Sequence, residues 1–237
     1  MGPVTRTEQH PASATFGRRV TGRDLIAVAS AFVLGLVLFG VILYLLLGPL
    51  DQGWALSFAP VLATPVLGAP ILWALLGRGW AWADLGFVRG RRLGHLLWEV
   101  PLAWVAALAL TVTLGSLLGL SPAGDSGDTA AAAYLGGGLL FLSALLTVVV
   151  IPALEEVCFR RVLFGWAQQR AGSVVAIVAS AAVFGLIHIV PAAMVLQFFI
   201  GLGTGVLVWR HQTLWASLAL HALNNGIVVA IVGAALV

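Results

Sequence analysis

Seven long apolar runs follow one another along this chain of 237 residues, and they restrict its fold more than any other feature. A helix of about 20 apolar residues crosses the hydrocarbon core of a bilayer. The runs span residues 25–47, 54–76, 96–120, 134–166, 173–190, 192–209 and 213–237. We therefore predict an all-α polytopic membrane protein, a bundle of seven transmembrane helices. An eighth, hidden span would change only the side on which the carboxyl terminus lies.

The composition excludes the main soluble classes. Hydrophobic residues make up 61% of the chain and charged residues only 9%, and the mean hydropathy is +1.06. A soluble domain needs more polar side chains than this to cover its surface. The net charge of +3 forms no basic stripe with interleaved aromatic residues, so we expect no nucleic-acid partner.

The charged residues lie mainly between the apolar runs. All twelve basic residues are arginines, and all but Arg160 and Arg161 occupy the polar tail 1–24 and then every second loop. The loops between carry acids alone, Asp51 in one and Asp125 and Asp128 in the other. This alternation predicts an amino terminus in the cytoplasm. The Arg-only composition, rich in Ala and Gly, fits a multi-pass protein of a bacterial cytoplasmic membrane.

Three polar clusters interrupt the later apolar runs. Ionisable groups within a membrane span are costly, so each one is a functional candidate. Each cluster has the spacing of four that places side chains on one face of a helix. The clusters are Glu155-Glu156-x-x-x-Arg160, Phe184-x-x-x-His188 and His221-x-x-x-Asn225.

The first cluster predicts an ion pair and an unpaired acid. Glu156 and Arg160 are four residues apart with the acid first, the favoured order for an ion pair on one helix face. Glu155 lies about 100° further round the helix, so Arg160 cannot serve both acids well. We expect the pair to fix helix packing and Glu155 to have no local partner. The alternative for Glu155 is a carboxylate at a helix end among lipid headgroups.

Together the clusters supply the groups needed for hydrolysis. A carboxylate in an apolar setting can take a proton from water, and a histidine can orient that water. A second histidine and an amide can donate hydrogen bonds to the oxyanion of a tetrahedral intermediate. The alternatives are structural: His188 as a packing histidine and Asn225 as a hydrogen-bonded bridge between helices.

These three motifs, in this order, resemble the CPBP family of intramembrane proteases, also called ABI, which includes the CAAX-processing endopeptidase of prenylated proteins. The family pattern is Glu-Glu-x-x-x-Arg, Phe-x-x-x-His and His-x-x-x-Asn or Asp, and this chain lacks none of its positions. The resemblance covers roughly residues 134–237, which we expect to form a CPBP-like catalytic helical core. The residues before it are a polar cytoplasmic tail (1–24) and amino-terminal transmembrane helices (25–120), which match the family only in being apolar.

The resemblance implies a glutamate-dependent endopeptidase that cleaves a membrane-associated protein or peptide. Glu155 would activate water with the help of His188, and His221 and Asn225 would form the oxyanion site. The remaining motif residues would support the site structurally: Glu156, Arg160 and Phe184. No cofactor is expected on this reading.

A zinc-dependent variant stays open. Glu155, His188 and His221 would make a His₂Glu zinc set with an open fourth position. The chain has no His-Glu-x-x-His pair on one helix, so the metal reading requires three separate helices to converge. For Glu155 to meet His188, we expect the span that carries the acids to start after Gly136–Gly138, over roughly 143–165.

Two other classes compete with the protease. A proton-coupled transporter would use the intramembrane Glu and His to carry ions; it predicts pH-coupled uptake without peptide cleavage, and the lack of internal repeats weighs against it. A non-catalytic scaffold or bacteriocin self-immunity protein would keep the fold and bind a peptide. The sequence specifies neither a cleavage site nor an oligomeric state.

Overall fold

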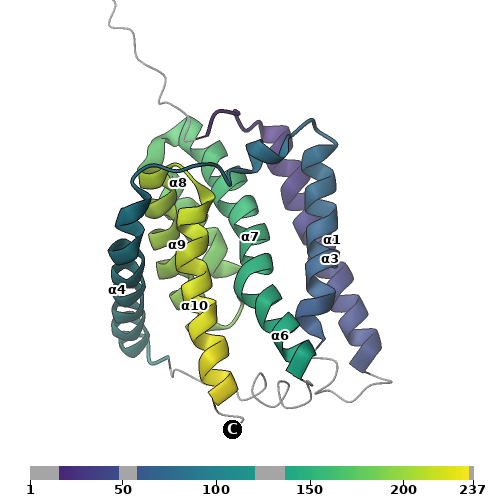
Figure 1. Cartoon of the computed structure of the whole chain (residues 1–237), viewed down its shortest axis with the longest axis vertical. Coiled ribbons are helices and arrows are strands. Elements are labelled where there is room, and N and C mark those ends of the chain that lie inside the picture. Colours follow the sequence, from purple (N-terminus) through teal and green to yellow (C-terminus); the bar gives the residue numbers. More distant parts are fainter. Residues whose placement is uncertain (1–15, 48–57, 121–136, 235–237) are drawn as a thin grey trace, which may run out of the picture.

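The computed structural model describes residues 16–47, 58–120 and 137–234, and within these ranges every regular element is a helix (Figure 1). Six of the described helices are long and apolar enough to cross a membrane. The predicted fold class, a polytopic helical membrane protein, is confirmed. The acidic loop around Asp125 and Asp128 lies outside the described residues, as do residues 1–15 of the polar tail and Gly136.

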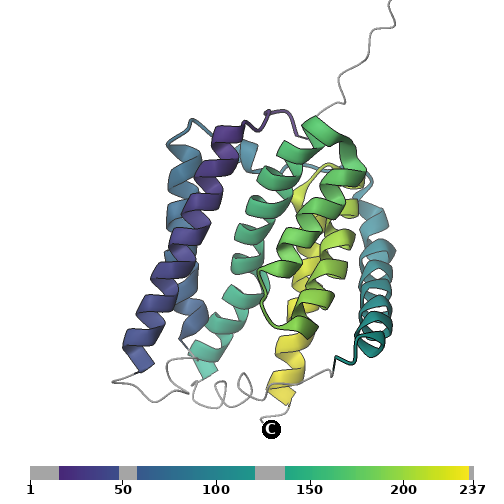
Figure 2. The ribbon, with the colours of Figure 1, turned by 180° about the vertical axis from the view of Figure 1, so that it is seen from behind.

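The first part of the chain supplies three long helices: α1 (Gly22–Leu47), α3 (Ala59–Leu76) and α4 (Leu96–Leu117). Helices α1 and α3 lie side by side in both views of the ribbon (Figures 1 and 2). Gly35 permits their close approach, because a Cβ atom there would lie 3.0 Å from the Val66 carbonyl oxygen. Two short 3₁₀ helices, η1 (Trp82–Leu85) and η2 (Leu93–His95), connect α3 to α4.

The central segment is one long, irregular helix. It consists of α6 (Gly137–Leu145), the π turn η3 (Leu146–Val150), α7 (Ile151–Glu156), the π turn η4 (Val157–Leu163) and α8 (Phe164–Leu186). The helix begins at Gly137, within the glycine patch rather than after it, and its candidate membrane-spanning part, Phe141–Leu186, has 46 residues. A straight helix of that length would measure about 70 Å, more than twice the hydrocarbon core.

Gly172 divides this segment in two. Its φ of 81° and ψ of 171° are not helical, and the positive φ is one that glycine adopts without steric cost. The chain reverses there, and the two arms lie antiparallel (Figure 2). The six candidate membrane-spanning segments of the described chain therefore include one that is folded into two arms at Gly172. The beginning of α1 and the end of α10 accordingly lie at opposite ends of the bundle (Figure 1).

Two further helices complete the bundle, α9 (Pro191–His211) and α10 (Leu214–Ala234). Helix α9 packs against the second arm of α8, and α4 lies against both α9 and α10 on the outer side. Small residues allow the closest approach: a Cβ atom on Gly201 of α9 would lie 3.0 Å from the Cα atom of Ala181 in α8. Such small residues are typical of helix interfaces in membranes, where van der Waals packing drives association.

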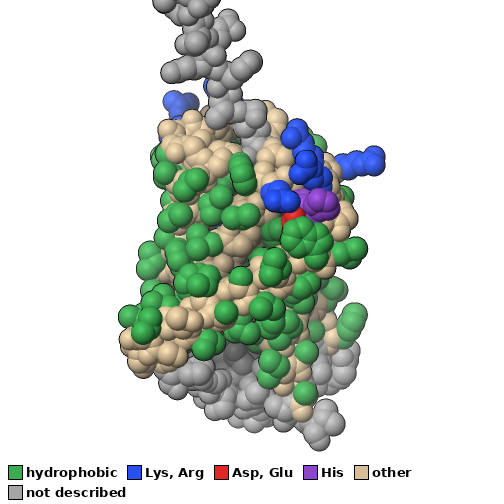
Figure 3. Space-filling model, turned by 90° about the vertical axis from the view of Figure 1, so that its left-hand side faces the viewer, with side chains coloured by type: hydrophobic (Ala, Val, Ile, Leu, Met, Phe, Trp, Pro, Cys, Tyr) green, Lys and Arg blue, Asp and Glu red, His purple; other side chains and the backbone are tan. Residues whose placement is uncertain are grey.

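Most of the described arginines gather at one end of the bundle, which we call the arginine-rich end. Its members flank α1, α3, α4, the turn in α8 and the end of α9: Arg18, Arg19, Arg23, Arg78, Arg89, Arg91, Arg92, Arg170 and Arg210. Figure 3 shows part of this group above an apolar side of the bundle. Acids pair with some of them: Arg18 lies 3.3 Å from Asp84, and Arg78 lies 2.7 Å from Asp24.

Candidate active site

The two glutamates lie in α7, between the π turns η3 and η4. A π turn inserts one extra residue into the helix and so changes the direction of the side chains that follow it; such turns are frequent at functional sites. In η4, the adjacent residues Arg160 and Arg161 are both buried but have different partners. Arg160 contacts α9, whereas Arg161 donates to the backbone carbonyls of Asp84 and Arg18 at the arginine-rich end.

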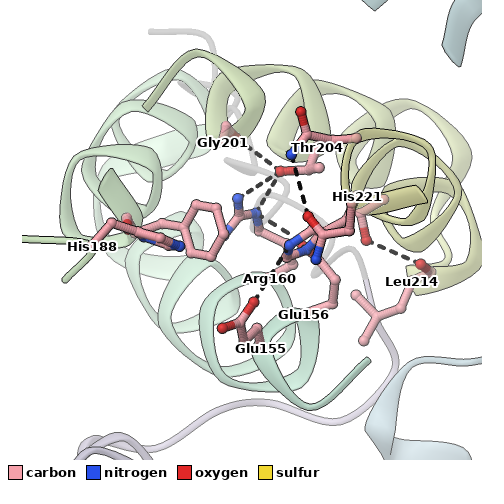
Figure 4. Close-up of polar contacts among 12 residues, drawn as sticks. Glu155, Glu156, Arg160, His188, Gly201, Thr204, Leu214 and His221 are labelled. Atoms are coloured by element: carbon pink, nitrogen blue, oxygen red, sulfur yellow. Dashed lines mark hydrogen bonds and ion pairs between the residues drawn. The ribbon is translucent and has the colours of Figure 1, made fainter. Parts of the chain in front are cut away.

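Glu156 and Arg160 form the predicted ion pair, and both side chains are fully buried (Figure 4). The Nε atom of Arg160 lies 3.6 Å from Oε2 of Glu156. The hydrogen bonds of the guanidinium go instead to Thr204 of α9, whose Oγ1 accepts from Nε at 2.8 Å and from Nη2 at 2.6 Å. The Thr204 hydroxyl in turn donates to the Gly201 carbonyl. The pair therefore connects the acid-bearing helix to α9.

Phe184 lies at the centre of the three motifs. Its ring is fully buried, and the Cζ atom of Arg160 lies 4.6 Å from the ring centroid, within cation–π range. The imidazoles of His188 and His221 contact the same ring edge-on, with centroid distances of 5.0 and 5.4 Å. Phe184 thus positions both histidines and the arginine around one rigid aromatic group.

His221 lies between the two adjacent glutamates (Figure 4). Its Nδ1 atom is hydrogen-bonded to Oε1 of Glu156 at 3.0 Å, and its Nε2 atom lies 3.4 Å from Oε2 of Glu155. The His221 side chain is 2% exposed, whereas the Glu155 side chain is 20% exposed. Glu155 therefore has a partner after all, but one that lies on α10, far away in sequence, rather than on its own helix.

His188 follows the end of α8. Its Nδ1 atom is hydrogen-bonded to the Phe184 carbonyl at 2.8 Å, which orients the ring and leaves Nε2 for another partner. The next residue, Ile189, has a φ of 61°, which is strained for a β-branched side chain. The half-buried His188 side chain meets the rest of the cluster through Phe184.

Asn225 bridges α10 and the π turn η3. Its Nδ2 atom donates to the Thr147 carbonyl at 3.0 Å, and its Oδ1 atom accepts from the Asn224 amide. In a π turn the Thr147 carbonyl would accept from the N–H of residue 152. Residue 152 is proline, which has no N–H, so the Asn225 amide takes the place of the missing donor.

The predicted residues therefore form two layers. Glu156, Arg160, Phe184 and His221 are buried, whereas Glu155, His188 and Asn225 are half-buried. The structure brings Glu155, Glu156 and His221 into direct contact. His188 joins this group through the Phe184 ring, and Asn225 through its place one helical turn beyond His221.

No three His, Cys, Asp or Glu side chains in the described part of the chain are grouped so that they could hold a metal ion. The proposed zinc set of Glu155, His188 and His221 has suitable donor chemistry, since the Nδ1 atom of each histidine is held by an acceptor. Its three members are nevertheless not gathered around one point. These three side chains therefore do not form a ligand cage for zinc.

Sequence reasoning missed three residues of this cluster. Thr204 accepts hydrogen bonds from Arg160, and Arg161 anchors the same π turn to the arginine-rich end. Pro152 lacks an N–H, and the Asn225 amide donates to the carbonyl that this N–H would have bonded. Thr204 had a local signal, since it is a polar residue within the Gly201-x-Gly203-x-Gly205 stretch of an otherwise apolar run. His95 and His211 each contact a different carboxylate oxygen of Glu99, at the arginine-rich end of α4 and away from this cluster.

The apolar helical bundle with buried ionisable groups defines an integral, multi-pass membrane protein. Residues 137–227 match the sequence profile of the family described as "Type II CAAX prenyl endopeptidase Rce1-like", and this range contains every predicted site residue. The resemblance that the three motifs indicated is thereby confirmed, and it supports a membrane peptidase.

One curated relative supports the same class. The chain is 27% identical over 88 residues to a Bacillus subtilis (strain 168) protein described as "Putative membrane peptidase YdiL". The match covers 37% of this chain and 36% of that protein, so it spans only about a third of the relative. No solved structure gives a significant match.

Proposed function

We propose that this protein is an intramembrane endopeptidase that hydrolyses a peptide bond in a membrane-associated protein or peptide. The observation that carries the proposal is the contact between Oε2 of Glu155 and Nε2 of His221, 3.4 Å apart, on helices within the bundle. The partly accessible Glu155 carboxylate thus lies beside an imidazole whose other nitrogen, Nδ1, is hydrogen-bonded to Glu156. The family match over 137–227 supports the same reaction class.

In the proposed reaction Glu155 is the general base. Its carboxylate takes a proton from water while the water oxygen attacks the carbonyl carbon of the scissile peptide bond, with His188 helping to orient the water. The proton then passes to the amide nitrogen as the carbon–nitrogen bond breaks. The products are a free carboxyl group and a free amine, so atoms and charge balance without a further reactant.

His221 and Asn225 are the proposed oxyanion donors. Glu156 holds Nδ1 of His221, and Nε2 is directed toward Glu155, where the reacting carbonyl would lie. Asn225 uses one Nδ2 hydrogen on the Thr147 carbonyl and has a second one to donate.

The central test is cleavage of a quenched-fluorescence peptide library by the purified full-length protein in lipid. Glu155→Ala should abolish cleavage, whereas Asp84→Asn, a carboxylate change at the arginine-rich end, should preserve it. Chelator should have no effect on the wild type. Cleavage by the Glu155→Ala variant would contradict the proposal. If chelator abolished wild-type cleavage and added zinc restored it, the metal-dependent mechanism would be favoured instead. A stable protein that cleaves no library member would favour the scaffold or self-immunity role.

We further propose that the arginine-rich end faces the cytoplasm. Arginines on the loops at one end of a bundle mark the cytoplasmic side. Cys158 is the only cysteine and is buried, so single-cysteine variants on a Cys158→Ser background report topology. In intact cells an impermeant maleimide should spare Arg89→Cys and label Leu118→Cys at the opposite end of α4. The reverse labelling pattern would contradict this orientation.

A further inference from the structure

An apolar groove of about 340 Å³ runs along the outer side of the bundle between α4 and α9. Its lining includes Leu102, Ala106 and Leu110 of α4, and Phe199 and Val206 of α9. None of the seven predicted site residues lines it. The groove is therefore separate from the candidate active site and needs its own explanation.

The dimensions of the groove match the apolar half of one lipid leaflet. On α4 it extends from Trp98, in the first turn at the arginine-rich end, to Leu110. Twelve residues of helix measure about 18 Å, and half of the hydrocarbon core is about 15 Å. The small residues Ala103, Ala107 and Gly203 contribute to the lining between bulkier neighbours and leave room for an acyl chain along this length.

The mouth of the groove is polar and positively charged. Arg210 lines it, and its Nε atom lies 2.9 Å from Oε1 of the buried Glu99. The Arg210 side chain stays 42% exposed, so the ion pair fixes the position of the guanidinium without covering it. Glu99 is held in turn by His211, whose Nε2 atom lies 2.5 Å from Oε2.

More arginines lie beside this mouth. The loop before α4 carries the exposed side chains of Arg89, Arg91 and Arg92. Two contacts tie this loop to the end of α9: the Arg91 N–H donates to the His211 carbonyl, and the Arg91 carbonyl is bonded to Nδ1 of His211. Figure 3 shows the basic group directly above the apolar side of the bundle. Glu99 and Arg210 are the charged residues of the lining and offset each other, so the net positive charge at the mouth comes from the three arginines of the loop.

We propose that this groove is a binding site for an anionic phospholipid of the leaflet at the arginine-rich end. One acyl chain lies along α4 and α9, and the phosphate contacts Arg210 and the arginines of the preceding loop. Guanidinium groups bind phosphate through charge-assisted hydrogen bonds, and basic pockets between helices suit anionic headgroups. The site does not depend on the proposed peptidase activity.

Native mass spectrometry of the full-length protein in neutral detergent tests the site. The probes are phosphatidylglycerol and phosphatidylcholine with identical acyl chains, which differ in net charge. Ala106→Trp fills the groove, and Ala109→Trp is its matched control, because Ala109 is also exposed on α4 but does not line the groove. Arg210→Gln removes the charge at the mouth, and Arg19→Gln removes one beside α1.

The wild type should prefer phosphatidylglycerol, and this lipid should raise its melting temperature. Ala106→Trp should lose both effects, and Ala109→Trp should retain them. Arg210→Gln should weaken phosphatidylglycerol binding about fivefold, and Arg19→Gln should leave it unchanged. Equal binding of the two lipids by the wild type, or unchanged binding by Ala106→Trp, would overturn the proposal. Because the readout is lipid binding, a loss of peptidase activity has no bearing on the result.

Discussion

The hydroxyl oxygen of Thr204 accepts two hydrogen bonds from the guanidinium of Arg160, and both side chains are fully buried. A hydroxyl on α9 therefore satisfies an arginine that is paired by charge with an acid on its own helix. This contact couples the position of α9 to that of the candidate base, because Arg160 and Glu155 lie on adjoining turns. The Thr204 hydroxyl is thus a positioning group for the site.

Removing the Thr204 hydroxyl should destabilise the protein. Thr204→Val keeps the shape but leaves a buried cation without its acceptor, which costs about 1.5–3 kcal/mol. Thermal unfolding of the purified protein should show a lower midpoint for Thr204→Val and a wild-type midpoint for Thr204→Ser. If Thr204→Val were as stable as Thr204→Ser, the hydroxyl would not be holding Arg160.

The two adjacent glutamates should respond differently to the same change. Glu156→Gln leaves Arg160 buried without a countercharge, and loss of one partner of a buried pair costs about 3–5 kcal/mol. Glu155→Gln affects a partly exposed side chain, so its unfolding midpoint should stay close to that of the wild type while cleavage falls by about 10²-fold or more. Parallel melting and cleavage measurements distinguish the two roles. Equal loss of stability in both variants would contradict the layered site.

Asn225 should have a structural role that can be separated from its chemical one. Asn225→Leu leaves the Thr147 carbonyl without its donor, at a cost of about 1–3 kcal/mol. Pro152→Ala restores the missing N–H at residue 152, so Asn225→Leu should cost less in that background. A double-mutant cycle on unfolding midpoints measures the difference.

Cleavage by the same variants tests the chemical role of Asn225. In the Pro152→Ala background Asn225→Leu should be folded yet still defective, because no donor replaces the amide at the oxyanion. Recovery of full cleavage in that double variant would show that Asn225 serves only as a bridge between helices. If the effects of Pro152→Ala and Asn225→Leu on the unfolding midpoint were additive, the Asn225 amide would not be replacing the N–H that Pro152 lacks.

Close packing of α9 against α8 should make Gly201 intolerant of a side chain. A Cβ atom there would lie 3.0 Å from both Cα and Cβ of Ala181 and 3.3 Å from Nη2 of Arg160. We expect Gly201→Ala to cost about 1–3 kcal/mol and to reduce cleavage. Gly115→Ala in α4 is the matched control, since no atom lies within 4 Å of its added Cβ and the helix should gain about 0.5–1 kcal/mol. Similar unfolding midpoints for the two variants would refute this account.

Local properties of the chain determined the helices, their number and the ion pair. An apolar run of membrane length must form a helix because no water is present to satisfy its backbone, and this depends on the run alone. Glu156 and Arg160 meet because residues four apart share a helix face, even though a π turn begins between them. The spacing of the motifs likewise placed Phe184 beside His188.

Contacts between helices were decided by the tertiary structure. The position of His221 between Glu155 and Glu156 depends on the depth and rotation of α10 against α7, which no spacing within either helix specifies. The π turns add to this, because each one shifts every later side chain to a new face and had no signal in the sequence pattern. The contacts of Thr204 with Arg160 and of Asn225 with the Thr147 carbonyl also depend on how the helices pack. Their partners lie on other helices, so packing alone selects them.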